Sequence, residues 1–125
     1  MLVRDKMITP VITGSPQTTL RDAQLLMAEN DVGRLPILDE GILVGIIAFK
    51  DIDRSLQSPG VIPEVPVEWI MARNPVTVDA NHKIVEAVKL LIEHKIAGLP
   101  VMEDGKVVGI ITETDILRYL LEILA

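Results

Sequence analysis

Thr112 and Asp115 have the residue types and the spacing of a site that could hold a sugar phosphate. They lie in the stretch GIITETD, residues 109–115, which leads directly into the apolar run ILRYLLEILA. This pattern predicts a strand that passes into a helix, and a helix start leaves unpaired backbone N–H groups where a phosphate can bind. The Thr112 and Thr114 hydroxyls can donate further hydrogen bonds. An ionised Asp115 carboxylate can accept from both hydroxyls of a ribose.

The same two residues also have a purely structural interpretation. Thr-x-x-Asp before an apolar run is a close variant of the capping box, with Thr112 as the N-cap and Asp115 reaching back to it. Both interpretations stay open at this level. A second copy of the motif bears on the choice: in GIIAFKD, residues 45–51, Ala48 has no hydroxyl for capping, yet Asp51 is retained.

That second copy belongs to an internal repeat. Residues 32–56 aligned on residues 96–120, at a shift of 64, give 11 identities in 25 positions. Upstream, Met7 aligns with Met71 and, after a slip of one residue, Pro10 with Pro75. The chain is therefore two copies of one unit, predicted as 1–60 and 61–125. They are joined by QSPGVIPEVPV, whose prolines keep the connection extended.

Each copy predicts the element order β-α-β-β-α. A short strand (PVIT or PVTV) precedes an amphipathic helix, capped by Thr19 in the first copy and Asn81 in the second. Two apolar strands follow, and glycine-containing turns at 39–41 and 103–105 make each pair a hairpin. A last helix begins near Asp51 or Asp115. The predicted fold class is α/β (α+β), with two repeats packed sheet to sheet and related by pseudo-two-fold symmetry.

Composition limits the function classes. The 125 residues are 49% hydrophobic but only 2% aromatic, so the core is aliphatic and a base-binding site would have little aromatic stacking available. The net charge of −6 argues against nucleic acid and anionic membranes as partners. With no cysteine, no signal-type segment and no apolar run of membrane-spanning length, a cytoplasmic location is expected.

Both copies contain the pattern LPV…DG..VGIIT..D after an M…P start. This pair of patterns resembles tandem cystathionine-β-synthase (CBS) domains, the Bateman module. The resemblance covers about residues 4–122. It implies a regulatory, non-catalytic module that binds an adenosine-containing ligand, such as AMP, ADP, ATP or S-adenosylmethionine, in clefts between the repeats. It also implies a homodimer and, since no effector domain is attached, a separate effector protein.

By the same resemblance each cleft takes residues from both copies. The stronger site would comprise Val11, Val32, Gly33, Arg34, Pro36, Thr112, Thr114 and Asp115. The weaker site would comprise Val76, Ile96, Ala97, Gly98, Pro100, Lys50 and Asp51. Arg34 stands where relatives that bind phosphorylated ligands often place a basic residue. An exposed arginine at a strand end is the alternative, but the net charge of −6 favours a role in holding a phosphate. The weaker site has Ala48 and Gly98 at its phosphate positions, which makes it doubtful for nucleotides.

Other candidates give weaker signals. His82 and His94 lie twelve residues apart, without the spacing of a helical metal pair, and no nucleophile–base constellation suggests an enzyme. Trp69, near the linker, is predicted to be a packing anchor. The alternative to a ligand sensor is a CBS pair that serves only as a dimerisation scaffold.

Overall fold

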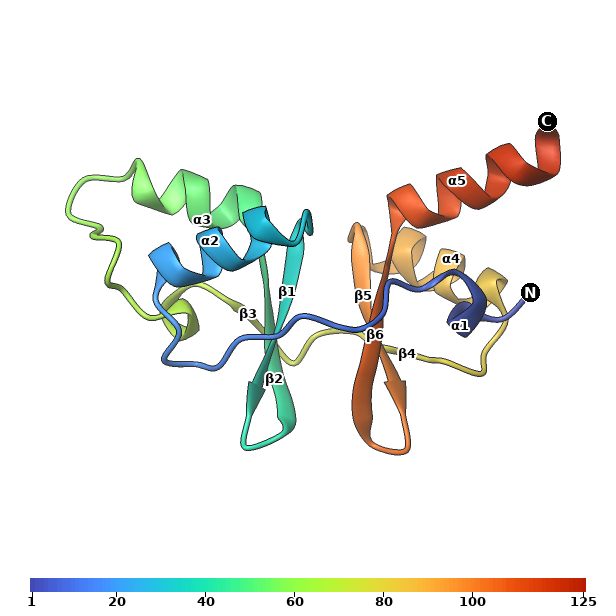
Figure 1. The fold of residues 1–125 in the computed structure, drawn as a ribbon, viewed down its shortest axis with the longest axis horizontal. Helices are drawn as coiled ribbons and strands as arrows, with labels where there is room; N and C mark the ends of the chain where they lie inside the picture. The colour runs from blue at the N-terminus through green and yellow to red at the C-terminus, as the bar shows by residue number, and fades with distance from the viewer. The chain divides into compact units, whose positions relative to one another are not determined.

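The computed structural model describes residues 1–125 and divides them into two compact units. We call Ile12–Pro75 the Asp51 unit, and Met1–Val11 together with Val76–Ala125 the Asp115 unit (Figure 1). The units therefore do not coincide with the sequence repeats 1–60 and 61–125. The first eleven residues belong with the second repeat, and residues 61–75 belong with the first.

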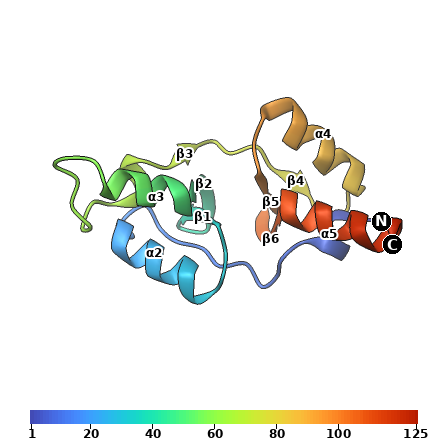
Figure 2. The ribbon, with the colours of Figure 1, turned by 90° about the horizontal axis from the view of Figure 1, so that it is seen from above.

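The Asp51 unit is a three-stranded sheet, of strand order β1-β2-β3, with two helices beside it. Its elements are α2 (Leu20–Glu29), β1 (Arg34–Asp39), β2 (Ile42–Ala48), α3 (Phe49–Leu56), the 3-10 helix η1 (Val67–Trp69) and β3 (Ala72–Arg73). Figures 1 and 2 show α2 and α3 side by side on one face of this sheet.

The Asp115 unit likewise has two longer helices and one short one, but its third strand lies on the other edge of its hairpin. Its elements are α1 (Val3–Lys6), β4 (Val78–Asp79), α4 (Ile84–His94), β5 (Gly98–Glu103), β6 (Lys106–Thr112) and α5 (Glu113–Leu124). The strand order is β4-β5-β6, and β4 runs parallel to β5. In Figure 2, α4 and α5 lie on the same side of the β5–β6 hairpin. No helix is both long enough and apolar enough to cross a bilayer.

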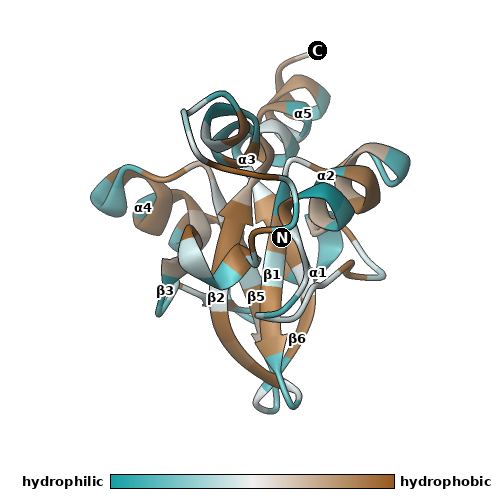
Figure 3. Cartoon of the chain, turned by 90° about the vertical axis from the view of Figure 1, so that its left-hand side faces the viewer, coloured by the Kyte–Doolittle hydropathy of each residue, from teal (hydrophilic) through white to brown (hydrophobic).

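Both predicted hairpins are confirmed. Their turns place Glu40 and Gly41 at φ 49° and 82°, and Asp104 and Gly105 at φ 51° and 77°. Positive φ at both central residues is the requirement of a type I′ turn, whose twist matches that of the flanking strands. Figure 3 shows the strands brown over most of their length and the hairpin tips teal.

The opening segment of each repeat completes the hairpin of the other repeat. Ile8 pairs with Ile110 of β6, and Ala72 of β3 pairs with Ile46 of β2. Each hairpin would otherwise leave one strand edge without hydrogen bonds, so the exchange satisfies both edges. This exchange accounts for the interleaved composition of the two units.

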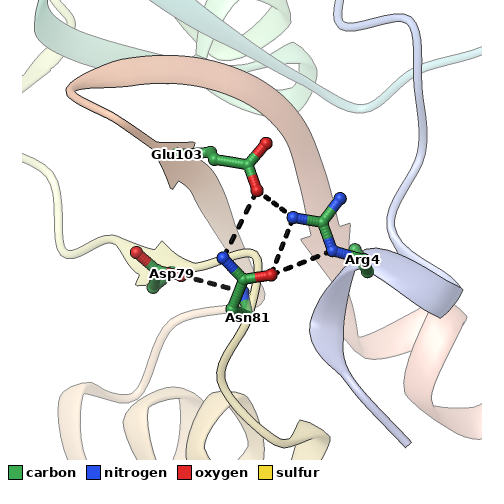
Figure 4. Close-up of polar contacts among 4 residues, drawn as sticks. All are labelled: Arg4, Asp79, Asn81 and Glu103. Atoms are coloured by element: carbon green, nitrogen blue, oxygen red, sulfur yellow. Dashed lines mark hydrogen bonds and ion pairs between the residues drawn. The ribbon is translucent and has the colours of Figure 1, made fainter.

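One of the two predicted helix caps is confirmed. Thr19 accepts a hydrogen bond from the Asp22 N–H at 3.1 Å, as an N-cap should. Asn81 does not cap α4, whose N-cap is Lys83 without a side-chain bond. Asn81 lies two residues too early, and its side chain is instead held between Arg4 and Glu103, at 2.8 Å from Arg4 Nη2 (Figure 4).

The cores of the two units are aliphatic, as the composition predicts. Leu20, Leu35 and Ile52 are fully buried in the Asp51 unit, while Leu99, Ile111 and the N-terminal Val3 are fully buried in the Asp115 unit. The expectation for Trp69 is wrong. Its side chain is 72% exposed, because Val67, at the other end of the short helix η1, is the residue that enters the core.

Candidate functional site

The start of α5 is fixed by the strand beside it. Thr112, the last residue of β6, pairs with Gly98 of β5, and the Glu113 N–H donates to the Ala97 carbonyl at 2.9 Å. Two of the predicted site segments, 96–98 and 112–115, therefore meet within the Asp115 unit.

Thr112 and Asp115 form a complete capping box. Asp115 Oδ2 accepts from the Thr112 N–H at 2.8 Å and from the Thr112 hydroxyl at 2.9 Å. The Asp115 N–H in turn lies 3.4 Å from Thr112 Oγ1. The structural interpretation of this motif is therefore correct.

The capping box uses only one of the two carboxylate oxygens of Asp115, Oδ2. The side chain is nearly buried, at 8% exposure, and Oδ1 accepts no hydrogen bond from the protein. No buried side-chain oxygen lacks a partner, so Oδ1 must be open to solvent. Beside it, the N–H and hydroxyl of the exposed Thr114 also have no protein partner. An acceptor and two donors therefore remain free at this helix start, enough for a hydroxylated and anionic ligand.

The start of α3 is built differently, although its backbone is equivalent. Arg34 pairs with Ala48, and the Phe49 N–H donates to the Gly33 carbonyl at 2.9 Å. Ala48 is the N-cap but makes no side-chain bond, so the N–H groups of this turn have no hydroxyl partner. Asp51 Oδ1 is instead 2.6 Å from Arg54 Nη2, and Lys50 is exposed.

A hollow of about 280 Å³ lies beside this second helix start, inside the Asp51 unit. Its lining is mostly apolar and consists of Met27, Ala28, Asp31, Val32, Gly33 and Phe49. Val32 and Gly33 were predicted site residues, whereas Phe49 was not. The low aromatic content predicts a base-binding site without aromatic stacking, yet Phe49 lines this hollow, because the first residue of α3 lies against Gly33.

The remaining predicted residues divide between the two units. Val76, Ile96 and Ala97 are half-buried in the Asp115 unit, and Val11 is half-buried at the end of its N-terminal segment. Pro36 and Pro100 are buried within β1 and β5, where they belong to the strand packing.

Arg54 and Arg118 are two basic residues that the motif does not include. They follow Asp51 and Asp115 by three residues and are identical in the repeat alignment. Their conservation between the two copies was therefore a signal available in the sequence.

Known proteins resemble this chain in both sequence and fold. The family model for the CBS domain matches residues 3–58 and again residues 67–122. Among solved structures, the CBS domain pair of protein MJ0100 in complex with 5′-methylthioadenosine and S-adenosyl-L-methionine superposes with a TM-score of 0.89. It shares 31% identity with this chain, and the match covers 98% of both chains.

Two curated proteins are similar over most of their length. The CBS domain-containing protein YhcV of Bacillus subtilis is 32% identical over 114 residues, which is 91% of this chain and 81% of YhcV. Hypoxic response protein 1 of Mycobacterium tuberculosis is 36% identical over 121 residues, which is 95% of this chain and 85% of that protein.

Proposed function

The chain belongs to the CBS domain family, and from this premise we propose that it is a regulatory module that senses an adenosine-containing nucleotide at Asp115. AMP, ADP and ATP are the proposed ligands, with S-adenosylmethionine as a further candidate. The similarity to a CBS pair in complex with 5′-methylthioadenosine and S-adenosyl-L-methionine supports the adenosine class. The proposal assigns no catalysis to the chain.

One observation carries this proposal: the divided use of the Asp115 carboxylate. Oδ2 holds the helix start, while Oδ1, in a side chain only 8% exposed, is open and has no donor. A nearly buried acceptor gains more from a hydrogen bond than an exposed one, because its hydration is already reduced. A ribose diol would supply the missing donors.

A thermal-shift screen with adenosine, AMP, ADP, ATP, NAD and S-adenosylmethionine tests the proposal. A ligand at a hundred times its Kd stabilises the folded chain by about 2.7 kcal/mol, which shifts the melting temperature measurably. If none of these ligands shifts the melting temperature, the sensing function is wrong.

Asp115→Asn separates the two roles of this side chain. The amide oxygen can replace Oδ2 in the capping box, but the amide nitrogen is a donor and cannot accept from a ribose hydroxyl. We expect the variant to melt within a few degrees of the wild type and to lose the ligand shift. A full ligand shift in Asp115→Asn would show that Oδ1 does not hold the ligand.

The alternative function, a dimerisation scaffold, is favoured by a different feature. Helix α5 exposes a set of large apolar side chains, namely Leu117, Leu120, Leu121, Ile123 and Leu124. Apolar side chains gathered on one element usually mark an interaction surface. We propose that a second copy of the chain covers α5, and that the effector is a separate protein. A stable dimer that responds to no ligand in the screen would leave the scaffold as the function.

A further inference from the structure

Arg118 occupies on α5 the position that Arg54 occupies on α3. Each lies three residues after the aspartate of the first helical turn. In the Asp51 unit, Arg54 Nη2 is 2.6 Å from Asp51 Oδ1. A guanidinium at this position therefore extends back to the first turn of its helix, which is the direction that helical side chains favour.

The equivalent pair is not formed in the Asp115 unit. Asp115 Oδ2 is taken by the capping box, and Arg118 makes no ion pair or side-chain hydrogen bond. The acid one turn further on, Glu122, is engaged by Lys6 at 2.7 Å. Arg118 is thus an exposed cation with all its donors unused, within reach of a helix start that also leaves Asp115 Oδ1 unpaired.

A phosphate at this helix start needs such a cation. Glu113 and Asp115 both lie in the first turn, and the chain carries a net charge of −6. The helix dipole alone offers an anion a modest attraction, which two carboxylates oppose. A guanidinium, by contrast, matches the geometry of a phosphate and can bind it with two parallel hydrogen bonds.

We propose that Arg118 is the residue that makes the Asp115 site prefer phosphorylated ligands over unphosphorylated ones. This inference rests on the proposed function of that site and adds to it a selectivity determinant on α5 itself. Arg54 plays no such part, because Asp51 already holds its guanidinium.

Titration calorimetry of adenosine and AMP against wild type, Arg118→Ala and Arg118→Lys tests the proposal. In Arg118→Ala we expect AMP to bind about ten- to a hundredfold more weakly, the effect of one lost hydrogen bond to a charged group. Adenosine should stay within about twofold of the wild type, because it carries no phosphate to lose a partner. Arg118→Lys should recover part of the AMP affinity, because lysine restores the positive charge but not the two parallel N–H donors of a guanidinium.

Two matched variants make the result specific. Arg54→Ala removes the equivalent arginine of the other repeat and should leave AMP affinity unchanged. Lys95→Ala removes the other exposed cation close to this helix start, two residues before Ala97, whose carbonyl accepts from Glu113. It should also leave the ratio of AMP to adenosine affinity unchanged.

The possible failures are distinguishable. If the wild type binds adenosine and AMP equally, or if Arg54→Ala or Lys95→Ala reduces the preference as much as Arg118→Ala, the role of Arg118 is refuted and the adenosine site stands. A proportional loss of both ligands in Arg118→Ala also refutes the selectivity. If the wild type binds neither ligand, the proposed function and this inference both fall.

Discussion

The side chain of Met7 covers the α-carbon of Gly109. A β-carbon added to Gly109 would lie 2.6 Å from Met7 Sδ and 2.9 Å from the Ile8 carbonyl oxygen. The same relationship occurs in the other unit, where a β-carbon on Gly45 would lie 2.5 Å from Met71 Sδ. Each methionine comes from the opening segment of the opposite repeat, so these contacts fasten that segment to its hairpin.

We predict that Gly109→Ala destabilises the chain by about 1–3 kcal/mol, the usual cost of overpacking. The methionine can move aside, but the Ile8 carbonyl is backbone that pairs with Ile110 and cannot. Denaturant unfolding measures the loss. Gly33→Ala is the matched control, because a β-carbon there meets nothing within 4 Å, and it should change the free energy of unfolding by less than about 1 kcal/mol.

A second prediction concerns the N-terminal segment. Val3 is fully buried in the core of the Asp115 unit, so Val3→Ala should cost about 2 kcal/mol. The amides of β5, β6 and α4 should lose hydrogen-exchange protection, while those of β1, β2 and α2 keep theirs. Val85→Ala, at a site 49% exposed on α4, should cost less than about 0.5 kcal/mol. Equal loss of protection in both units would contradict the assignment of this segment.

These contacts mark the limit of what the sequence could predict. The hairpins, the Thr19 cap and the Thr112–Asp115 box follow from local rules, since their residues are neighbours along the chain. The place of Val3 and Met7 does not, because it depends on contacts with distant residues, such as His82 for Val3 and Gly109 for Met7. Short apolar segments carry too little pattern to reveal such contacts.

Asn81 and Trp69 illustrate the same limit. Asn81 has the residue type of a cap, but Arg4, from the far end of the sequence, binds it instead. Trp69 has the large apolar side chain of a core residue, yet the geometry of a three-residue helix directs Val67 inward instead. Asp115 could be predicted from its motif. The position of Phe49 in the lining of the hollow could not, because it depends on the fold.

Thr112→Ala should cost the chain about 1 kcal/mol, the typical value of an N-cap hydroxyl. The Thr112 hydroxyl accepts from the Asp115 N–H and donates to Oδ2, and alanine can do neither. Thr112→Ser should restore the stability, which thermal or denaturant unfolding would show. Thr114→Ala is the control, because its exposed hydroxyl has no protein partner. A stable Thr112→Ala variant would mean that the capping box contributes little.

The apolar stripe on α5 predicts a homodimer. Leu117, Leu121 and Leu124 are 60%, 69% and 78% exposed and follow one another at helical spacing. Light scattering at micromolar concentration should give twice the chain mass, and Leu121→Glu should reduce it to one chain mass by burying a charge in the interface. Ile42→Glu, at a hairpin site 68% exposed, should leave the dimer intact. A monomeric wild type would refute the prediction.

The last prediction is that the two sites are unequal. The Asp115 helix start has a complete capping box, a free carboxylate oxygen and the free N–H and hydroxyl of Thr114, whereas the Asp51 helix start has Ala48 and a carboxylate that Arg54 engages. That exposed ion pair is worth at most about 1 kcal/mol, so it hinders a ligand without excluding it. The missing hydroxyl matters more, because Ala48 stands at the position that Thr112 has in the other repeat.

Calorimetry should therefore find one tight AMP per chain. Asp115→Ala should weaken AMP and adenosine alike, because both carry the ribose, while Asp51→Ala should leave the tight site unchanged. Two equal sites per chain would show that the repeats do not differ in the way their helix starts indicate.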